Sequence, residues 1–216
     1  MTSPIRRLTR LVSVLRAENP GPMTLEGTNS LLLHAPGSDG VVVVDPGPDL
    51  PEHVQALAAA GPVELVLITH RHNDHTEAID SLRELTAAPV RAALPEHCRH
   101  GQPLRDGERL TAAGVSIEVL ATPGHSPGSV CLHAPDLGEQ DDDGTPTGVL
   151  FSGDTLFQGG PGATGRSYSD FDTIIESIRE RLLTLPESTV VHTGHGGSTR
   201  IGDEKPHLQE WIERGH

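Results

Sequence analysis

The sequence predicts an α/β fold in a single domain that spans residues 1–216. Two observations support this prediction. Short β-branched segments are followed by longer segments with apolar residues at helical spacing, and this order occurs in two successive blocks. The chain has neither an internal repeat nor a linker, and its length suffices for one well-buried core.

The first block contains strand and helix patterns in alternation. Four segments are expected to be strands: residues 5–17, 31–34, 41–44 and 65–68. A helix is expected after the capping-box spacing of Asp49 and Glu52, and Gly61 ends it. A second helix ends before Pro89 and is followed by a short strand at 90–93. The apolar face of this second helix is expected to consist of Ile79, Leu82 and Leu85.

The second block has the same order. Strands are expected over residues 110–121 (two strands with a turn at Gly114), 129–133, 149–152 and 190–191. Residues 135–148 are rich in Asp, Gly and Pro, so we expect a solvated loop without chemistry. Apolar residues at helical spacing from Phe171 to Leu185 predict a helix that faces the core and is capped by Ser169 and Asp172. A last helix is expected over residues 204–214.

Composition excludes several classes of partner. The 16 basic and 30 acidic residues give a net charge of −14, which repels phosphate backbones, and the few aromatic residues make a poor surface for base stacking. No apolar stretch approaches the length of a membrane span, and the run at 11–15 is too short for a signal sequence. Cys98 and Cys131 lack the spacing of a disulfide framework. We therefore expect a cytoplasmic protein with a small-molecule substrate, and no oligomeric state is predicted.

Residues 69–75, Thr-His-Arg-His-Asn-Asp-His, place three imidazoles and a carboxylate within six positions. On a strand the adjacent residues Asp74 and His75 would point to opposite faces, and on a helix side chains at i and i+2 lie about 200° apart, so these donors are expected to converge on a loop. Such a loop at the end of a strand is a common place for sites in α/β layers. Imidazole and carboxylate together suit Zn²⁺, Fe or Mn²⁺. We therefore predict a metal site with His70, His72, Asp74 and His75.

Three later strand ends each carry one residue of ligand type among turn residues. They are His125 in Thr-Pro-Gly-His-Ser-Pro-Gly, Asp154 in Ser-Gly-Asp-Thr, and His195 in Thr-Gly-His-Gly-Gly. Each stretch alone is a weak indication, because His and Asp are common in turns. In this order after residues 69–75, they resemble the metallo-β-lactamase superfamily. Residues 151–157 and 193–196 are most similar to its glyoxalase II branch, the hydroxyacylglutathione hydrolases.

The resemblance implies a four-layer αββα sandwich and two divalent metal ions, most simply Zn²⁺ with Fe or Mn as alternatives. The first ion would be held by His70, His72 and His125, the second by Asp74, His75 and His195, with Asp154 as the bridge. It further implies that a metal-bridging hydroxide, oriented by Asp74 as the catalytic residue, attacks a thioester or a related ester. Two divalent ions and two carboxylates give the site a net charge of about +2, which attracts an anionic or carbonyl-bearing substrate.

Two further segments bear on the substrate and on ligand orientation. Residues 163–168 stand where many glyoxalase II sequences have Gly-Arg-Thr-Asp, so Arg166 and Tyr168 are candidate substrate residues, with a solvated loop as an equal alternative. The sequence has 21 residues after His195, so the helical domain that helps glyoxalase II hold glutathione is expected to be missing or reduced to one helix, and the thiol is left open. Asp45 is a candidate for orienting a ligand histidine, with capping as the alternative.

Two other activities remain as alternatives. Persulfide dioxygenases share the motif set but use one iron, on residues that match His70, His125 and Asp154. Residues 19–29 are similar to the opening of the β-lactamase-like-protein-2 group, some of which cut RNA, although the acidic charge counts against RNA here. A binding module without catalysis is the remaining class. The eight other histidines are expected on the surface or in packing.

Overall fold

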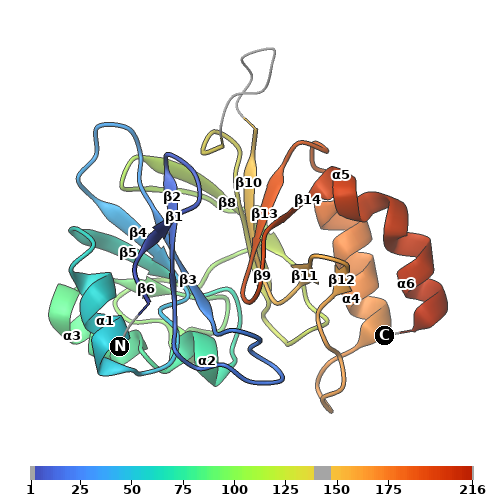
Figure 1. Cartoon of the computed structure of the whole chain (residues 1–216), viewed down its shortest axis with the longest axis horizontal. Helices are drawn as coiled ribbons and strands as arrows, with labels where there is room; N and C mark the ends of the chain where they lie inside the picture. The colour runs from blue at the N-terminus through green and yellow to red at the C-terminus, as the bar shows by residue number, and fades with distance from the viewer. Residues whose placement is uncertain (1–2, 139–146, 216) are drawn as a thin grey trace.

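The structure is a computed structural model that describes residues 3–138 and 147–215 (Figure 1). Two six-stranded sheets lie face to face, and helices cover the outer face of each (Figure 1). This order of helix, sheet, sheet and helix is the four-layer αββα sandwich, so the predicted α/β fold class is confirmed.

The first sheet contains six strands in sequential order. They are β1 (Arg6–Arg7), β2 (Val12–Arg16), β3 (Asn29–Leu33), β4 (Val41–Val44), β5 (Val63–Leu67) and β6 (Val90–Arg91). Strands β1 to β4 are antiparallel neighbours, whereas β4, β5 and β6 run parallel. The C-terminal ends of β4 and β5 therefore lie side by side, and the amide of Asp45 donates to the carbonyl of Leu67.

The second sheet has the order β14-β13-β10-β9-β8-β7. Its strands are β7 (Arg109–Ala112), β8 (Val115–Ala121), β9 (Val130–Ala134), β10 (Val149–Gly153), β13 (Val190–Thr193) and β14 (Thr199–Arg200). Strands β8 and β10 both pair antiparallel with β9, and β10 pairs parallel with β13. Consequently β8, β10 and β13 point the same way, and their C-terminal ends lie along one edge of the sheet.

Helices bury one face each against the sheets. Helices α1 (Pro51–Ala58) and α3 (Ile79–Thr86) pack on the first sheet, while α4 (Phe171–Ser177), η2 (Ile178–Leu182) and α6 (Leu208–Arg214) pack on the second. A third apolar cluster fills the space between the sheets. Short elements complete the described chain: α2 (Asn73–Thr76), η1 (Pro95–His97), β11 (Leu156–Phe157), β12 (Gly160–Pro161), α5 (Ile201–Glu204) and η3 (Lys205–His207).

The first predicted strand is wrong in detail. Residues 5–17 form a hairpin of β1 and β2, because the chain turns back at Thr9. The hydroxyl of Thr9 accepts hydrogen bonds from the amides of Leu11 and Val12, and the Thr9 amide donates to the Val12 carbonyl. A side-chain turn of this kind competes with a continuous strand.

The predicted helix starts are also wrong. Helix α1 begins at Pro51 without a side-chain cap, so the capping role expected of Asp49 is absent. Helix α4 is capped by Asp170, whose carboxylate accepts from the Thr173 amide at 2.7 Å, and not by the expected Ser169 and Asp172. The last helical region starts at Ile201, before residue 204, and consists of α5, η3 and α6. On α3, Leu85 is 58% exposed, so Ile79 and Leu82 alone form its buried face.

Other predictions have simpler outcomes. Cys98 and Cys131 are both free, as expected. The solvated loop expected at 135–148 lies largely outside the described residues, which exclude 139–146. Three of the histidines without a motif are buried in packing: His53, His133 and His192. None of the helices in the described parts of the chain is both long and apolar enough to cross a bilayer.

The buried histidines predict acid sensitivity. Desolvation by burial lowers the pKa of His192 from 6.5 to about 4, and that of His53 to the same value. Between about pH 4 and pH 6.5 the unfolded chain therefore binds more protons than the folded protein. As a result, the free energy of unfolding falls as the pH is lowered through this range, by up to about 3 kcal/mol per histidine. We expect His192→Gln to flatten this dependence.

Urea unfolding of the wild type and of His192→Gln, at about pH 7 and about pH 5, measures the effect. The exposed His207→Gln is the matched control, and it should lose stability on acidification as the wild type does. An equally steep loss in His192→Gln would contradict the assignment.

Candidate metal centre

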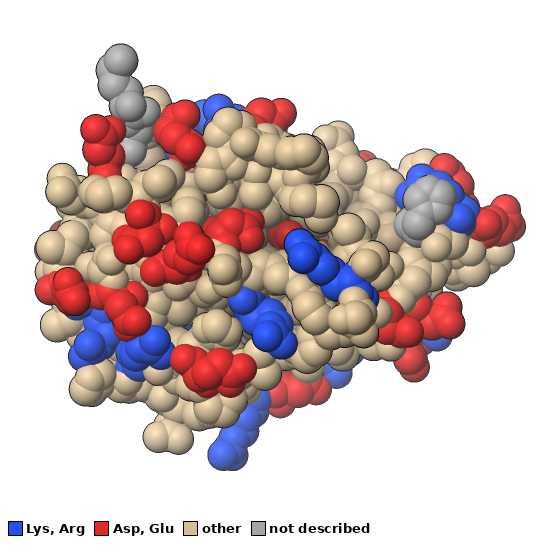
Figure 2. Space-filling view, turned by 90° about the horizontal axis from the view of Figure 1, so that it is seen from below, with Lys and Arg blue, Asp and Glu red and all other residues tan. Residues whose placement is uncertain are grey.

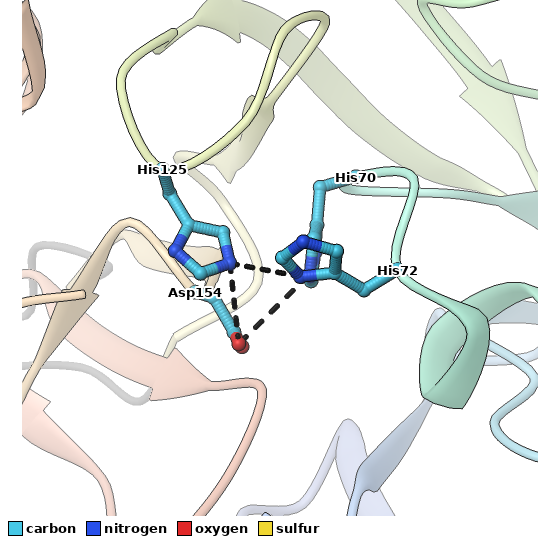
Figure 3. Close-up of side chains that lie close together, drawn as sticks. All are labelled: His70, His72, His125 and Asp154. Carbon is cyan, nitrogen blue, oxygen red and sulfur yellow. Dashed lines mark hydrogen bonds and ion pairs between the residues drawn. The ribbon is translucent and has the colours of Figure 1, made fainter. Parts of the chain in front are cut away.

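The predicted ligand residues all lie at strand ends on one side of the molecule. Residues 70–75 follow β5, and the residues after β8, β10 and β13 contain His125, Asp154 and His195. Because these strands end at facing edges of the two sheets, loops that are distant in the sequence meet between the sheets. Figure 3 shows part of the result, with His125 and Asp154 pointing toward His70 and His72.

One cluster contains three imidazoles and a carboxylate. Nδ1 of His72 lies 3.0 Å from Nε2 of His70 and 3.0 Å from Nε2 of His125. Oδ2 of Asp154 lies 3.6 Å from Nε2 of His125 and 3.9 Å from Nε2 of His70 (Figure 3). One donor atom from each of the four residues falls within 4.8 Å of the others, so the group can hold one metal ion.

A second cluster lies on the other side of Asp154. Oδ2 of Asp74 is 3.2 Å from Nε2 of His195 and 3.4 Å from Nε2 of His75. The two imidazole nitrogens are 3.2 Å apart. Asp154 reaches this cluster as well, with Oδ1 3.6 Å from His75 and Oδ2 3.5 Å from His195. The structure thus brings together all seven residues that the sequence singled out as metal ligands.

The loop expected for residues 69–75 forms only in part. His70 and His72 lie on the loop, but Asp74 and His75 belong to the single turn of helix α2, for which His72 is the N-cap residue. The prediction that all four donors lie on a loop was therefore wrong for these two. A helical turn still brings them together, because their partner His195 comes from another strand end.

The donor set fits a pair of cations better than it fits protons. Nδ1 of His72 faces two other imidazole nitrogens, and a neutral imidazole pair can share only one proton between facing nitrogens. Oδ1 of Asp154 is buried and has no hydrogen-bond partner among the described residues. A buried carboxylate oxygen without a partner is costly, and a divalent cation would satisfy it together with the imidazole lone pairs.

The electrostatics of the two clusters differ. Burial lowers the pKa of His70 well below its usual value and that of His72 to about 4, so both imidazoles are neutral, the form that binds metals. Against the effect of burial, hydrogen bonds with Asp154 and Asp74 raise the pKa of His195 to about 9. The second cluster therefore favours positive charge, which protons supply when no cation is bound.

Every ligand-type histidine has an oxygen partner on its outer nitrogen. His75 Nδ1 lies 2.9 Å from Oδ2 of Asp45, His125 Nδ1 2.8 Å from the Ala163 carbonyl, and His195 Nδ1 3.3 Å from the Gly27 carbonyl. His70 Nδ1 lies 3.1 Å from the Thr69 hydroxyl, and His72 Nε2 2.8 Å from the Tyr168 hydroxyl. Such partners fix the tautomer and orientation of metal-binding imidazoles.

Asp45 makes the contacts expected of an orienting residue and none of a helix cap. It follows β4 with a left-handed backbone (φ 54°) and is 2% exposed. Its Oδ1 accepts from the Thr69 amide at 2.8 Å, and its Oδ2 accepts from the Thr69 hydroxyl at 2.6 Å. Because the same Oδ2 contacts His75, Asp45 ties the start of the motif at residue 69 to its end.

Two polar residues behind the second cluster, Thr28 and Asn29, were not predicted from the sequence. The hydroxyl of Thr28 donates to Oδ2 of Asp74 at 3.2 Å, and it accepts from the Asn19 amide group at 3.0 Å. The Asn29 side chain donates to the carbonyls of Thr193 and Gly196, at 3.1 Å each, and so holds the loop of His195. In the sequence, Thr28 and Asn29 stand just before the apolar residues of β3. This position was the available indication of their role, because polar groups that are buried are normally hydrogen-bonded.

Glycine is required where the loops approach most closely. A Cβ at Gly194 would lie 2.2 Å from Oδ1 of Asp154 and 2.8 Å from Cε1 of His75. Any side chain at this position would therefore displace residues of both clusters.

A cavity of about 690 Å³ opens beside the two clusters. His72, Asp74, His125, Asp154 and His195 form its floor, and Arg166 and Tyr168, the candidate substrate residues, lie in its wall together with Arg71 and Met23. The volume is typical of small-molecule sites.

Tyr168 is positioned to orient a ligand-type histidine. With Nδ1 of His72 turned toward the cluster, Nε2 carries the proton and donates to the Tyr168 hydroxyl. We expect Tyr168→Phe to weaken binding of the first metal ion about 10- to 100-fold. Competition with a chromophoric chelator measures this affinity without any substrate. An affinity within about twofold of the wild type would show that the hydrogen bond does not position His72.

Comparisons with known proteins agree with this geometry. The sequence profile of the metallo-beta-lactamase superfamily matches residues 23–195. Probable metallo-hydrolase YqgX of Bacillus subtilis (strain 168) is 33% identical over 195 residues, which cover 79% of this chain and 88% of that protein. A hydroxyacylglutathione hydrolase of Pseudomonas putida (strain W619) is 40% identical over 158 residues, 71% of this chain. The match covers 56% of that relative, little more than half of its length.

A solved structure shows the same fold. TTHA1623, crystallised in a di-iron-bound form, superposes with a TM-score of 0.68 at 32% identity, covering 86% of this chain and 94% of that one. The predicted resemblance and the fold that it implied are thereby confirmed.

Proposed function

This chain belongs to the metallo-β-lactamase superfamily, in its glyoxalase II-like branch, and on that premise we propose that it is a binuclear metallohydrolase that cleaves a thioester or a related ester. The observation that carries the proposal is the pair of clusters joined by Asp154. Each cluster offers at least three donor atoms, and one carboxylate reaches both.

The proposal assigns the donors in two sets. The first metal ion would be held by His70, His72 and His125, and the second by Asp74, His75 and His195, with Asp154 between them. When bound, the ions supply a water activated at neutral pH and a Lewis acid for the carbonyl of the substrate. Zn²⁺ suits this donor set, as do Fe and Mn²⁺.

The protein itself orients the reactants. The side chain of Asp74 is 27% exposed and lies in the floor of the cavity. Burial opposes its ionisation, but hydrogen bonds from His195 and His75 hold its pKa well below the usual range, so the carboxylate is charged and can accept a hydrogen bond from the attacking water. Thr28 fixes this carboxylate from behind. Asp74 is therefore the proposed catalytic residue.

The dioxygenase alternative uses fewer of these residues. One iron on His70, His125 and Asp154 would leave Asp74, His75 and His195 without a ligand role, although they lie within metal-binding distance of one another. RNA cleavage is disfavoured by the net charge of −14. The arrangement of the second cluster thus supports hydrolysis with two metal ions.

A substrate panel tests the proposal. The metal-loaded protein is assayed for release of free thiol from several acyl-thioesters, for opening of lactones, for cleavage of single-stranded RNA, and for oxygen uptake with a persulfide. We expect thiol release to be the fastest reaction and oxygen uptake to be absent. Oxygen uptake or RNA cleavage without thiol release would overturn the proposal. Asp39→Asn, a change at an exposed loop carboxylate, is the control variant and should retain the wild-type pattern.

A further inference from the structure

Glu204 is a buried acid that the proposed mechanism does not use. Within the described parts of the chain the buried acidic residues are Asp45, Asp154 and Glu204, and the first two belong to the metal centre. Figure 2 shows acidic side chains on the surface at both ends of the face seen from below, where water solvates them. Glu204, at the end of α5, is only 3% exposed. Burial of a carboxyl group costs free energy unless hydrogen bonds compensate it, so its partners indicate what it holds.

Both oxygens of Glu204 accept hydrogen bonds from outside α5. Oε1 accepts from the Thr199 hydroxyl at 2.6 Å, and Oε2 accepts from the Gly159 amide at 3.0 Å. Thr199 precedes the helix on β14, whereas Gly159 lies in the turn that joins β11 to β12. The carboxyl group therefore connects the C-terminal helices to the β11–β12 hairpin, across 45 positions of sequence.

Apolar packing supports the same connection. Leu156, at the start of the hairpin, belongs to the buried cluster that also contains Ile201 and Trp211. Strand β12 lies beside α6 (Figure 1). A Cβ at Gly160 would lie 3.1 Å from Nη2 of Arg214 and 3.6 Å from Nε1 of Trp211, so the hairpin and α6 are in close contact. One side of the hairpin is thus held by the C-terminal helices.

The hairpin also contacts the metal centre. The chain forms it between Asp154 and Ala163, and the carbonyl of Ala163 contacts His125. The ring of Phe157 stacks on the imidazole of His195, with ring centroids 6.4 Å apart and ring planes at 10°. Aromatic pairs at this separation are stabilising. Contacts to the nitrogens of an imidazole leave the ring free to tilt about its edge, and a ring stacked on its face limits that tilt.

We propose that Glu204 is a positioning residue for the metal centre, because it holds the β11–β12 hairpin so that Phe157 keeps the imidazole of His195 aimed into the second cluster. Glu204 acts through Phe157 and not by contact with a metal ion. The inference rests on the proposed function with two metal ions and adds a residue of the C-terminal helices to it. Loss of the stacked ring, or of the carboxyl group that holds it, should weaken binding of the second metal ion about 3- to 10-fold.

Four variants separate this role from a purely structural one. Glu204→Met removes both acceptor oxygens but keeps the volume, so its urea midpoint should stay close to that of the wild type. Glu204→Gln keeps an oxygen for the Gly159 amide, and its own amide group can donate to the Thr199 hydroxyl, so it should behave as the wild type. Phe157→Leu removes the ring and keeps an apolar side chain. Glu210→Ala changes an exposed glutamate of α6 and is the matched control.

Competition with a chromophoric chelator measures the two stepwise affinities for Zn²⁺ without any substrate. Glu204→Met and Phe157→Leu should each weaken one step about 3- to 10-fold and leave the other within about twofold of the wild type. The double variant should bind no more weakly than Phe157→Leu alone, because both changes act through one contact. Effects that multiply in the double variant, or equal weakening of both steps, would overturn the inference.

An NMR readout needs neither metal nor catalysis. In protein with isotope-labelled histidine, the Cε1–H signal of His195 is the one that disappears in His195→Gln. Phe157→Leu and Glu204→Met should shift this signal in the same direction in the metal-free protein, whereas Glu204→Gln and Glu210→Ala should not. An unshifted signal in Glu204→Met, or failure of that variant to fold, would overturn the inference. If these shifts occur but the wild type binds a single ion or releases no thiol, it is the proposed function that fails.

Discussion

Asp154→Ala is expected to lose both metal ions together and to lower kcat/KM by at least about 1000-fold, which corresponds to about 4 kcal/mol of transition-state stabilisation. The reason is its position between the clusters. Its Oδ2 lies 3.6 Å from His125 and 3.5 Å from His195, and its Oδ1 lies 3.6 Å from His75. Removing the carboxylate takes a donor from each set at once and leaves five imidazoles with only Asp74 to balance the cations.

Elemental analysis of the purified variant, alongside an assay of thiol release, checks this expectation. Asp39→Ala removes an exposed carboxylate of the same size and should retain metal and activity. Full metal content in Asp154→Ala would show that the bridging assignment is wrong. Loss of one ion alone would place Asp154 in a single cluster, which is also contrary to the proposal.

Asp45→Ala is expected to lower the free energy of unfolding of the metal-free protein by about 3 to 5 kcal/mol, the usual cost of removing one partner of a buried charged pair. Asp45 is buried and accepts from the Thr69 amide, the Thr69 hydroxyl and His75. Without it, three donors in the interior lose their acceptor. Burial opposes protonation of His75, but the charge of Asp45 raises its pKa well above the usual value, so the variant also leaves a buried imidazolium poorly compensated.

The second metal ion should also bind less tightly to Asp45→Ala, by about 10- to 100-fold, since His75 loses the group that orients it. Asp45→Asn is the informative comparison, because asparagine tolerates the left-handed backbone at φ 54° and keeps one acceptor oxygen. It should fall between the wild type and Asp45→Ala in urea unfolding. A change below about 1 kcal/mol in Asp45→Ala would contradict the orienting role.

The structure brings the seven predicted ligand residues together because each one follows an apolar strand. Residues 65–68 and the motif after them are local patterns, and the resemblance supplied the order of the later loops. The pairing of strands then explains why the loops meet, since β8, β10 and β13 point the same way. What the resemblance implied about separate cation sites remains a prediction.

The supporting contacts could not be predicted in the same way. Thr28 reaches Asp74 across 46 positions of sequence, and Tyr168 reaches His72 across 96. No local period or spacing encodes such pairs, because packing of the two halves creates them. Helix starts failed for a different reason. Several polar residues near Asp170 were equally good caps by type, and the choice among them depends on the turn that joins Ser169 to Arg166.

The proposed hydrolysis depends on two cations held between strand-end loops, and a metal titration tests this dependence most directly. The protein is stripped with a chelator, Zn²⁺ is added stepwise, and release of thiol from an acyl-thioester is followed at each step. Activity that rises until two equivalents per chain and then stays constant is the predicted result. A break at one equivalent, or activity restored only by a single iron with uptake of oxygen, would contradict a hydrolase with two metal ions.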